Sequence, residues 1–328
     1  MRTCLIFNPT AKGDKARRLQ RHFDVIQSDC TLKQTYAQGA AHTLAAEAVN
    51  EGYEVIVAAG GDGTLNEVLN GIAEVPGGLD NVKLGVIPLG TVNVFAREVG
   101  IPIDLKKAWD NVLAGHSRRY ALPMMEFQQD GETKQRYFVQ LAGVGLDARA
   151  VELVNWRLKK AVGPLAYVVA GMRALQEKPS RMKIEHDGQV TEGELVLIGN
   201  GRYYGGSFPI LPNAVLEEQL IEACVIPDLK FRSLFRAGIA ALTQFRKTIK
   251  GATYFKTNAF TLTAIPPAPI QVEGEAIGRT PARLSFSGET IEVIVPESTA
   301  NLPQPKSGSD AASCDAKSSR ITSSMGAS

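Results

Sequence analysis

A short glycine-rich segment follows a continuous apolar stretch and has the composition of a phosphate-holding loop. Val55–Ala59 reads as a buried strand, Gly60–Thr64 has the sequence GGDGT, and a helical pattern begins at Thr64. Glycines let the backbone approach a ligand closely, and a helix start offers free N–H groups and a positive dipole end to an anion. Asp62 is placed to hold Mg²⁺, directly or through water, against nucleotide phosphates. The spacing matches neither GxxxxGK[ST] nor GxGxxG, and a plain turn capped by Asp62 and Thr64 is the alternative for this segment taken alone.

Two further turns favour the phosphate interpretation. The first strand ends in Asn8–Gly13 (NPTAKG), and a later strand ends in Pro88–Asn93 (PLGTVN). Ligands of an open parallel sheet bind outside the carboxyl ends of its strands. The sequence therefore predicts that these two turns lie beside Gly60–Thr64 along one edge.

The first part of the chain alternates short apolar runs with helical patterns. Continuous apolar runs separated by helices predict a parallel sheet that is covered on both faces. The expected strands are Thr3–Asn8, Leu32–Tyr36, Val55–Ala59 and Val82–Pro88, and the expected helices are Lys12–Ile26, Gln38–Asn50, Thr64–Ile72 and Val92–Val99.

The pattern changes near Tyr120 to strands punctuated by Gly and Pro, which is typical of an antiparallel β-sandwich. The expected strands are Tyr137–Ala142, Met182–His186, Glu194–Ile198, Leu220–Ile226, Ala259–Ile265, Ile270–Glu273 and Ile291–Val295, and helical stretches cover 147–176 and 231–250. We therefore expect an α/β N-terminal domain over 1–121 and a mainly antiparallel second domain over 122–287. A segment over 288–298 is expected to return to the first domain, and the polar tail over 300–328 is expected to be disordered.

Composition excludes several other classes of protein. A formal net charge of +2 gives no support for nucleic acid binding. The 4 cysteines and 4 histidines are scattered without zinc-ligand spacing, and each histidine is expected to be a surface or structural residue. The first apolar run is too short for a signal peptide, and no stretch reaches the roughly 18 apolar residues of a membrane helix. A cytoplasmic protein is expected, and it would have to visit the inner face of the membrane if its substrate is a lipid.

The three loop sequences together resemble those of the diacylglycerol kinase catalytic-domain family, which also contains sphingosine, ceramide and bacterial lipid kinases. The motifs are NPTAKG, GGDGTLNEVLNG and PLGTVNVFAREVGIP, followed by GVGLDA at Gly143–Ala148 and VEGE at Val272–Glu275. The resemblance covers about residues 1–296 and implies a NAD kinase/diacylglycerol kinase-like fold. GGDGT alone is shared with NAD kinases.

The resemblance implies an ATP-dependent lipid kinase that uses Mg²⁺ at Asp62. It implies that Glu275 is the general base that draws the proton from the lipid hydroxyl, with a solvated turn residue as the alternative. The residues that it assigns to ATP and its Mg²⁺ are Asn8, Thr35, Gly60, Gly61, Asp62, Gly63, Thr64, Gly90 and Thr91.

Four positions depart from the family pattern. Val94 stands where many members have aspartate, Ala121 lies where a second aspartate is expected, and 217–220 (EEQL) replaces a metal-binding DDGL. The family's DGE has become Glu273–Glu275. These departures leave the acceptor open between a diacylglycerol-like and a sphingoid lipid. They also leave two rivals, a NAD kinase-like enzyme and a catalytically weakened nucleotide- or lipid-binding regulator.

Residues 228–250 form a basic amphipathic pattern with Phe and Leu on the opposite face. Such a pattern suits peripheral contact with an anionic membrane surface. The alternative is a helix that packs its apolar face on the sheet. The sequence does not indicate the oligomeric state.

Overall fold

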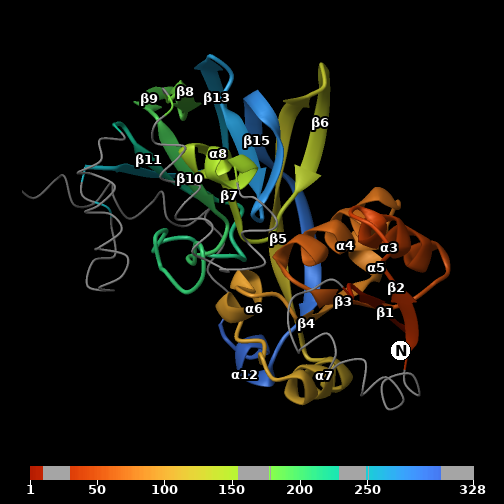
Figure 1. The fold of residues 1–328 in the computed structure, drawn as a ribbon. Coiled ribbons are helices and arrows are strands. Elements are labelled where there is room, and N and C mark those ends of the chain that lie inside the picture. Colours follow the sequence, from red (N-terminus) through yellow and green to blue (C-terminus); the bar gives the residue numbers. More distant parts are fainter. Residues whose placement is uncertain (10–29, 154–176, 178, 229–248, 250, 304–328) are drawn as a thin grey trace, which may run out of the picture.

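The computed structural model describes residues 1–9, 30–153, 177, 179–228, 249 and 251–303. Figure 1 shows an N-terminal α/β part and a β-rich part joined by long strands. The expected helix Lys12–Ile26, most of the helical stretches 147–176 and 231–250, and the tail from 304 onward lie outside the described residues.

Parallel strands build the N-terminal sheet in the order β2-β1-β3-β4-β15. Most of β1 and all of β3 are buried, as their continuous apolar sequences predict. The end of β15 pairs in parallel with β4 through Glu292 and Val293, so a segment near the end of the chain completes this sheet. The bounds are β1 Thr3–Phe7, β2 Thr31–Gln34, β3 Val55–Gly60, β4 Lys83–Pro88 and β15 Glu275–Ile294.

Helices cover both faces of this sheet. On one face α3 (Ala40–Asn50) packs on β1, α4 (Asp62–Glu74) on β3 and α5 (Gly78–Asn81) on β15, and on the other face α7 (Leu105–Ala114) packs on β4. In α4 the buried side chains recur every three or four residues, which is the period that places them on one helix face. The two faces therefore carry separate apolar cores.

The second part is an antiparallel sandwich, which confirms the expected fold class. One layer contains β12-β11-β10-β7-β14 and the other contains β9-β8-β13-β15-β5-β6, with an apolar core between them. The strands are β5 Ser117–Gln129, β6 Glu132–Tyr137, β7 Leu141–Gly145, β8 Arg181–His186, β9 Gln189–Gly193, β10 Leu195–Gly199, β11 Ile221–Ile226, β12 Thr253–Thr257, β13 Ala259–Ile265 and β14 Pro269–Val272. Three short helices accompany them: α6 Val94–Glu98, α8 Leu146–Leu153 and α12 Glu297–Ala300.

The structure differs from the expected strands mainly in the region of 117–145. The β5–β6 hairpin was not expected, and the predicted strand Tyr137–Ala142 is wrong because β6 ends at Tyr137 and β7 begins at Leu141. Between them, backbone N–H groups donate to a buried carboxylate, that of Glu273, in place of a strand partner. The expected division at 121/122 falls inside β5, which runs beside β15 through both parts of the molecule (Figure 1).

Among the helices that the structure describes, none has the length and apolar character needed to cross a bilayer.

Candidate active site

The loops after β1, β3 and β4 meet at the carboxyl edge of the parallel sheet. The N–H of Asn8 donates to the carbonyl of Ala59 at 3.0 Å, and the N–H of Gly90 donates to the carbonyl of Gly60 at 3.2 Å. Asn8 Nδ2 also donates to Thr64 Oγ1 at 3.1 Å, so the first loop is tied to the start of α4. The three loops therefore meet at the edge that the parallel arrangement of the strands predicts, and direct hydrogen bonds hold them together.

The remaining residues assigned to the nucleotide lie on the same edge. The N–H of Thr35, just after β2, donates to the carbonyl of Phe7 at 2.9 Å. Thr91 is exposed beside Gly90, and a Cβ added at Gly63 would meet nothing within 4 Å. The structure thus brings together all the residues that the sequence assigned to ATP, and it leaves space beside the first turn of α4.

Two glycines allow the β3 and β4 loops to touch through their backbones. A Cβ added at Gly90 would lie 2.6 Å from Gly61 Cα, and one added at Gly61 would lie 3.3 Å from Gly90 Cα. A side chain at Gly90 would therefore force the two loops apart. The close approach of the two loops therefore requires glycine at position 90.

Asp62 is the first residue of α4, and no side chain among the described residues caps this helix through a hydrogen bond. Its carboxylate accepts hydrogen bonds from the N–H groups of Asn93, Val94 and Phe95 at the start of α6. Burial raises the pKa of Asp62, and these N–H groups oppose that rise because they favour the charged form. Asp62 therefore links the β3 loop to the β4 loop while it remains beside the open first turn of α4.

A tight turn between β14 and β15 carries two carboxylates toward the same region. Val272 pairs with Glu275, so the turn contains only Glu273 and Gly274, with φ values of 51° and 78°. Two successive residues with positive φ form a type I′ turn, in which glycine is favoured at the second position.

The carboxylate of Glu273 is buried inside the protein. Its Oε1 accepts hydrogen bonds from the N–H groups of Val139 at 3.1 Å and Gln140 at 2.7 Å, whereas its Oε2 is buried without a hydrogen-bond partner among the described residues. Burial raises the pKa of Glu273 to about 8, and the nearby charge of Asp62 is the next cause. The two carboxylates therefore interact although they come from opposite ends of the chain.

Glu275 makes different contacts. Its Oε1 accepts from Gln38 Nε2 at 2.7 Å, and its Oε2 accepts from Arg136 Nη1 at 2.8 Å. Glu67 lies close by, because the charge of Glu275 is among the causes that raise the pKa of Glu67 after burial. Glu275 thus bridges the segment before α3 to the β6 strand, across the two parts of the molecule.

Sequence reasoning singled out Glu275 and treated Glu273 only as a departure from DGE. In the structure Glu273 is buried, and the charge of Asp62 contributes, after burial, to its raised pKa. A signal was present in the sequence, because two acids that flank one glycine indicate a turn with a carboxylate at its tip. The depth at which that carboxylate is buried could not be found from the turn alone.

The two acids that replace part of the DDGL pattern are neutralised by cations of the chain. Glu217 pairs with the buried Arg118 at 2.5 Å, and Glu218 pairs with Lys256 at 2.5 Å. Within the described part of the chain, no group of three or more His, Cys, Asp or Glu side chains is arranged to hold a metal ion. Both carboxylates at this motif are therefore held in ion pairs with cations of the chain.

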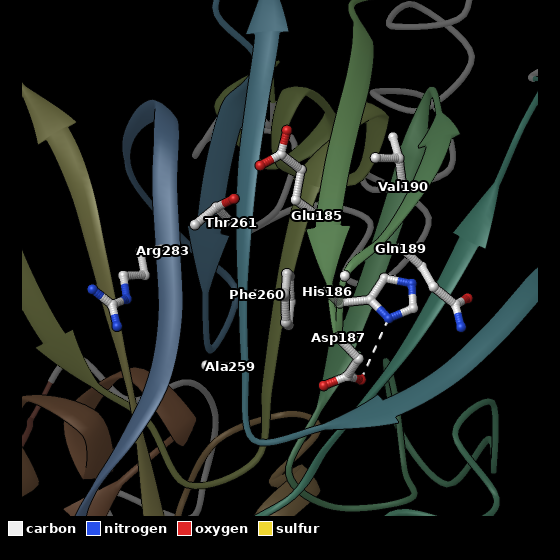
Figure 2. A pocket seen from close by; sticks show the side chains of 10 residues that line it. Glu185, His186, Asp187, Gln189, Val190, Ala259, Phe260, Thr261 and Arg283 are labelled. Carbon is white, nitrogen blue, oxygen red and sulfur yellow. Dashed lines mark ion pairs between the residues drawn. The ribbon is translucent and has the colours of Figure 1, made fainter.

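A separate open cavity of about 420 Å³ lies at the tip of the β8–β9 hairpin and beside β13 (Figure 2). His186 stacks on Phe255 with ring centroids 3.7 Å apart, and its Nδ1 lies 3.6 Å from Asp187 Oδ2. These contacts give His186 a structural role. None of the residues assigned to the nucleotide lines this cavity.

Comparison with known proteins agrees with this architecture. The profile of the diacylglycerol kinase catalytic domain matches residues 2–125, and the profile of the YegS C-terminal NAD kinase beta sandwich-like domain matches residues 140–295. A protein of Staphylococcus carnosus (strain TM300) named diacylglycerol kinase is 32% identical over 309 residues, which cover 92% of this chain and 97% of that protein. A diacylglycerol kinase of Staphylococcus aureus (strain bovine RF122 / ET3-1) is 32% identical over 307 residues, covering 92% and 94%.

Solved structures show the same fold. A crystal structure of a diacylglycerol kinase from Bacillus anthracis str. Sterne has a TM-score of 0.65 at 21% identity and covers 91% of this chain and 98% of that chain. A second chain from the same organism has a TM-score of 0.71 at 22% identity, with 91% and 96% covered. The fold and the matched profiles define a two-domain transferase of the kinase type. The chain belongs to the diacylglycerol kinase catalytic-domain family.

Proposed function

We propose that this protein transfers the γ-phosphoryl group of ATP, with Mg²⁺, to a hydroxyl group of a diacylglycerol-like or sphingoid lipid. Membership of the family and the name of the relatives at 32% identity support a lipid acceptor. The observation that carries the proposal is the meeting of the β1, β3 and β4 loops, with Asp62, at the open start of α4. The proposal places the protein in the cytoplasm at the inner face of the membrane, with peripheral contact through 228–250.

The phosphates of ATP would bind at the first turn of α4 and against the β4 loop. The free N–H groups of a helix start attract anions, and Gly61 and Gly63 leave no side chain in the way. Asn8 and Thr64 hold each other in place at 3.1 Å, so their polar groups border the same space. Gly90 and Thr91 lie on its other side.

The residues present fit a hard divalent cation. Mg²⁺ prefers oxygen ligands, and the carboxylate of Asp62 supplies them at the start of α4. We assign the cation to Asp62. The charge of Asp62 also affects the pKa of Glu273. When bound, Mg²⁺ neutralises the charge that develops on the phosphate oxygens.

Phosphoryl transfer needs mainly positioning and one group that accepts a proton. The lipid hydroxyl oxygen forms a bond to the γ-phosphorus, the bond from phosphorus to the β,γ-bridging oxygen breaks, and ADP leaves with that electron pair. The hydroxyl proton passes to a carboxylate of the β14–β15 turn. The balanced products are a phosphorylated lipid and ADP.

The geometry favours Glu273 over Glu275 as the proton acceptor. Glu273 has a buried, unpartnered oxygen and interacts with Asp62, whereas both oxygens of Glu275 are bound to Gln38 and Arg136. A carboxylate with a pKa near 8 is also a stronger base than an ordinary glutamate. Glu275, the base implied by the family motif, is the alternative.

The test is transfer from radiolabelled ATP to vesicles that contain diacylglycerol or sphingosine, with NAD offered in parallel. We expect labelled lipid, loss of label with Asp62→Asn, and normal label with the matched control Asp187→Asn on the exposed β8–β9 turn. Labelled NADP without labelled lipid would establish the NAD kinase-like rival. Nucleotide binding without transfer to any acceptor would establish the regulator. Vesicle sedimentation tests the membrane contact through 228–250.

A further inference from the structure

A cluster of three polar side chains is buried beneath the turn that carries Glu273 and Glu275. The hydroxyl of Tyr204 donates to Asp147 Oδ2 at 2.6 Å. Gln271 Nε2 donates to the same Oδ2 at 2.7 Å and to the Tyr204 hydroxyl at 2.8 Å. Gln271 and Tyr204 are 1% and 8% exposed, and Asp147 is partly buried, so the cluster is largely shielded from bulk water.

A glycine makes room for this cluster. A Cβ added at Gly143 would lie 2.3 Å from Asp147 Oδ2, 2.6 Å from the Tyr204 hydroxyl and 2.8 Å from Gln271 Nε2. All three polar atoms therefore converge on one point of the β7 backbone. Any larger residue at this position would break the cluster.

The cluster fixes which way the amide of Gln271 faces. Burial raises the pKa of Asp147, and the hydrogen bonds from Tyr204 and Gln271 oppose that rise because they favour the charged form. In that form the carboxylate only accepts hydrogen bonds, so Asp147 holds the Nε2 side of the amide toward itself. The Oε1 side then faces the turn, where it accepts the N–H of Gly274 at 2.7 Å. Burial and the neighbouring Asp147 raise the pKa of Tyr204 well above its ordinary value, so its hydroxyl stays a donor.

We propose that Gln271, oriented by Asp147 and Tyr204, is a positioning residue that holds the Glu273–Gly274 turn in its left-handed conformation. The turn needs this support because Glu273 has a φ of 51°, which is unfavourable for a residue with a side chain. A displaced turn would move the Glu273 carboxylate away from Asp62 and from the reacting hydroxyl. The inference rests on the proposed kinase function, and it assigns no contact with substrate to these three residues.

The first test replaces Gln271 with methionine, which keeps the length but removes both the acceptor and the donor. We expect kcat to fall by about 100-fold, the loss that a displaced catalytic group of about 1 Å can produce, with KM for ATP and lipid little changed. Thr257→Val is the matched control, because Thr257 is a buried polar residue of the same sandwich, 2% exposed, that does not touch the turn. A fall in kcat no larger than that of Thr257→Val would overturn the inference.

The second test exchanges the amide and the carboxylate between positions 271 and 147. Gln271→Glu places a second carboxylate against Asp147 and is expected to lower kcat, whereas Asp147→Asn combined with Gln271→Glu restores a donor facing an acceptor and is expected to recover roughly 10-fold of the loss. If kcat of the double variant is no higher than that of Gln271→Glu, Asp147 does not orient the side chain at position 271 and the inference is refuted. A raised KM for lipid at normal kcat in Asp147→Asn would instead show that Asp147 binds the acceptor.

Amide hydrogen exchange at Gly274 gives a readout that is independent of catalysis. We expect its protection to be lost in Gln271→Met and kept in Thr257→Val. If the wild-type protein transfers phosphate to no acceptor, the proposed function fails, and unchanged protection of Gly274 in Gln271→Met would overturn the positioning contact separately. Lost protection with unchanged kcat would show that the contact does not serve the reaction.

Discussion

Replacement of Glu273 by glutamine should make the folded protein more stable at alkaline pH while it removes the proposed activity. Glutamine keeps an oxygen that can accept the N–H groups of Val139 and Gln140, and it carries no charge. The wild-type carboxylate, by contrast, must be ionised inside the protein beside Asp62 when the pH is high. At alkaline pH the Glu273→Gln variant should therefore have a higher free energy of unfolding and a lower kinase activity than wild type.

The direction and size follow from the pKa of Glu273, which burial and Asp62 raise from an ordinary 4.5 to about 8. Between these pH values the folded protein keeps a proton that the unfolded chain has lost, so the free energy of unfolding falls as the pH rises toward 8. At about 1.4 kcal/mol per pH unit, the full difference amounts to about 5 kcal/mol. Local opening that admits water to the carboxylate would reduce it to roughly 2 kcal/mol. Below pH 4.5 the free energy of unfolding of Glu273→Gln no longer exceeds that of wild type, because Glu273 is protonated in both the folded and the unfolded chain.

The assay is urea unfolding of wild type and Glu273→Gln between pH 5 and pH 9, with Glu132→Gln at the exposed β5–β6 turn as the control. We expect the stability difference between Glu273→Gln and wild type to grow across this range, and Glu132→Gln to follow wild type. Parallel curves for all three proteins would refute the reasoning, because they would show that Glu273 titrates as an ordinary glutamate.

Four further predictions concern the loops, the ion pairs and the β14–β15 turn. Gly90→Ala places a Cβ 2.6 Å from Gly61 Cα and should lower the free energy of unfolding by about 1–3 kcal/mol in thermal melts. Gly63→Ala meets nothing within 4 Å and should keep the protein stable, yet weaken ATP binding measured by calorimetry. Arg118→Met leaves the carboxylate of Glu217 without its partner and should cost about 3–5 kcal/mol in urea unfolding, whereas a cost under about 1 kcal/mol would mean that the pair is well hydrated. Glu275→Gln should retain measurable lipid kinase activity, and a loss as complete as that of Glu273→Gln would make Glu275 the proton acceptor.

The phosphate side of the candidate site could be predicted because it is built from local patterns. Continuous apolar strands such as β3, each followed by a helix, indicate a parallel sheet, and a parallel sheet brings its loops to one edge. The loops that contain Asn8 and Gly90 were placed at this edge on that basis, and both lie where expected. The β5–β6 hairpin was missed because its strands are polar on the exposed side and because a buried carboxylate takes the N–H groups that follow it.

The acceptor side depended on tertiary structure. Glu273 and Glu275 are two residues apart on one turn and share the same local sequence pattern, yet one is buried against Asp62 and the other bridges Gln38 and Arg136. Their separate roles follow from which segments pack around the turn, and those segments are distant in the chain. The sequence by itself determined the glycine-rich loop after β3 and the edge on which it lies, because apolar strands, glycines and a helix start are local patterns. Only the tertiary structure decided which carboxylate faces that loop, because burial and charge coupling arise from packing.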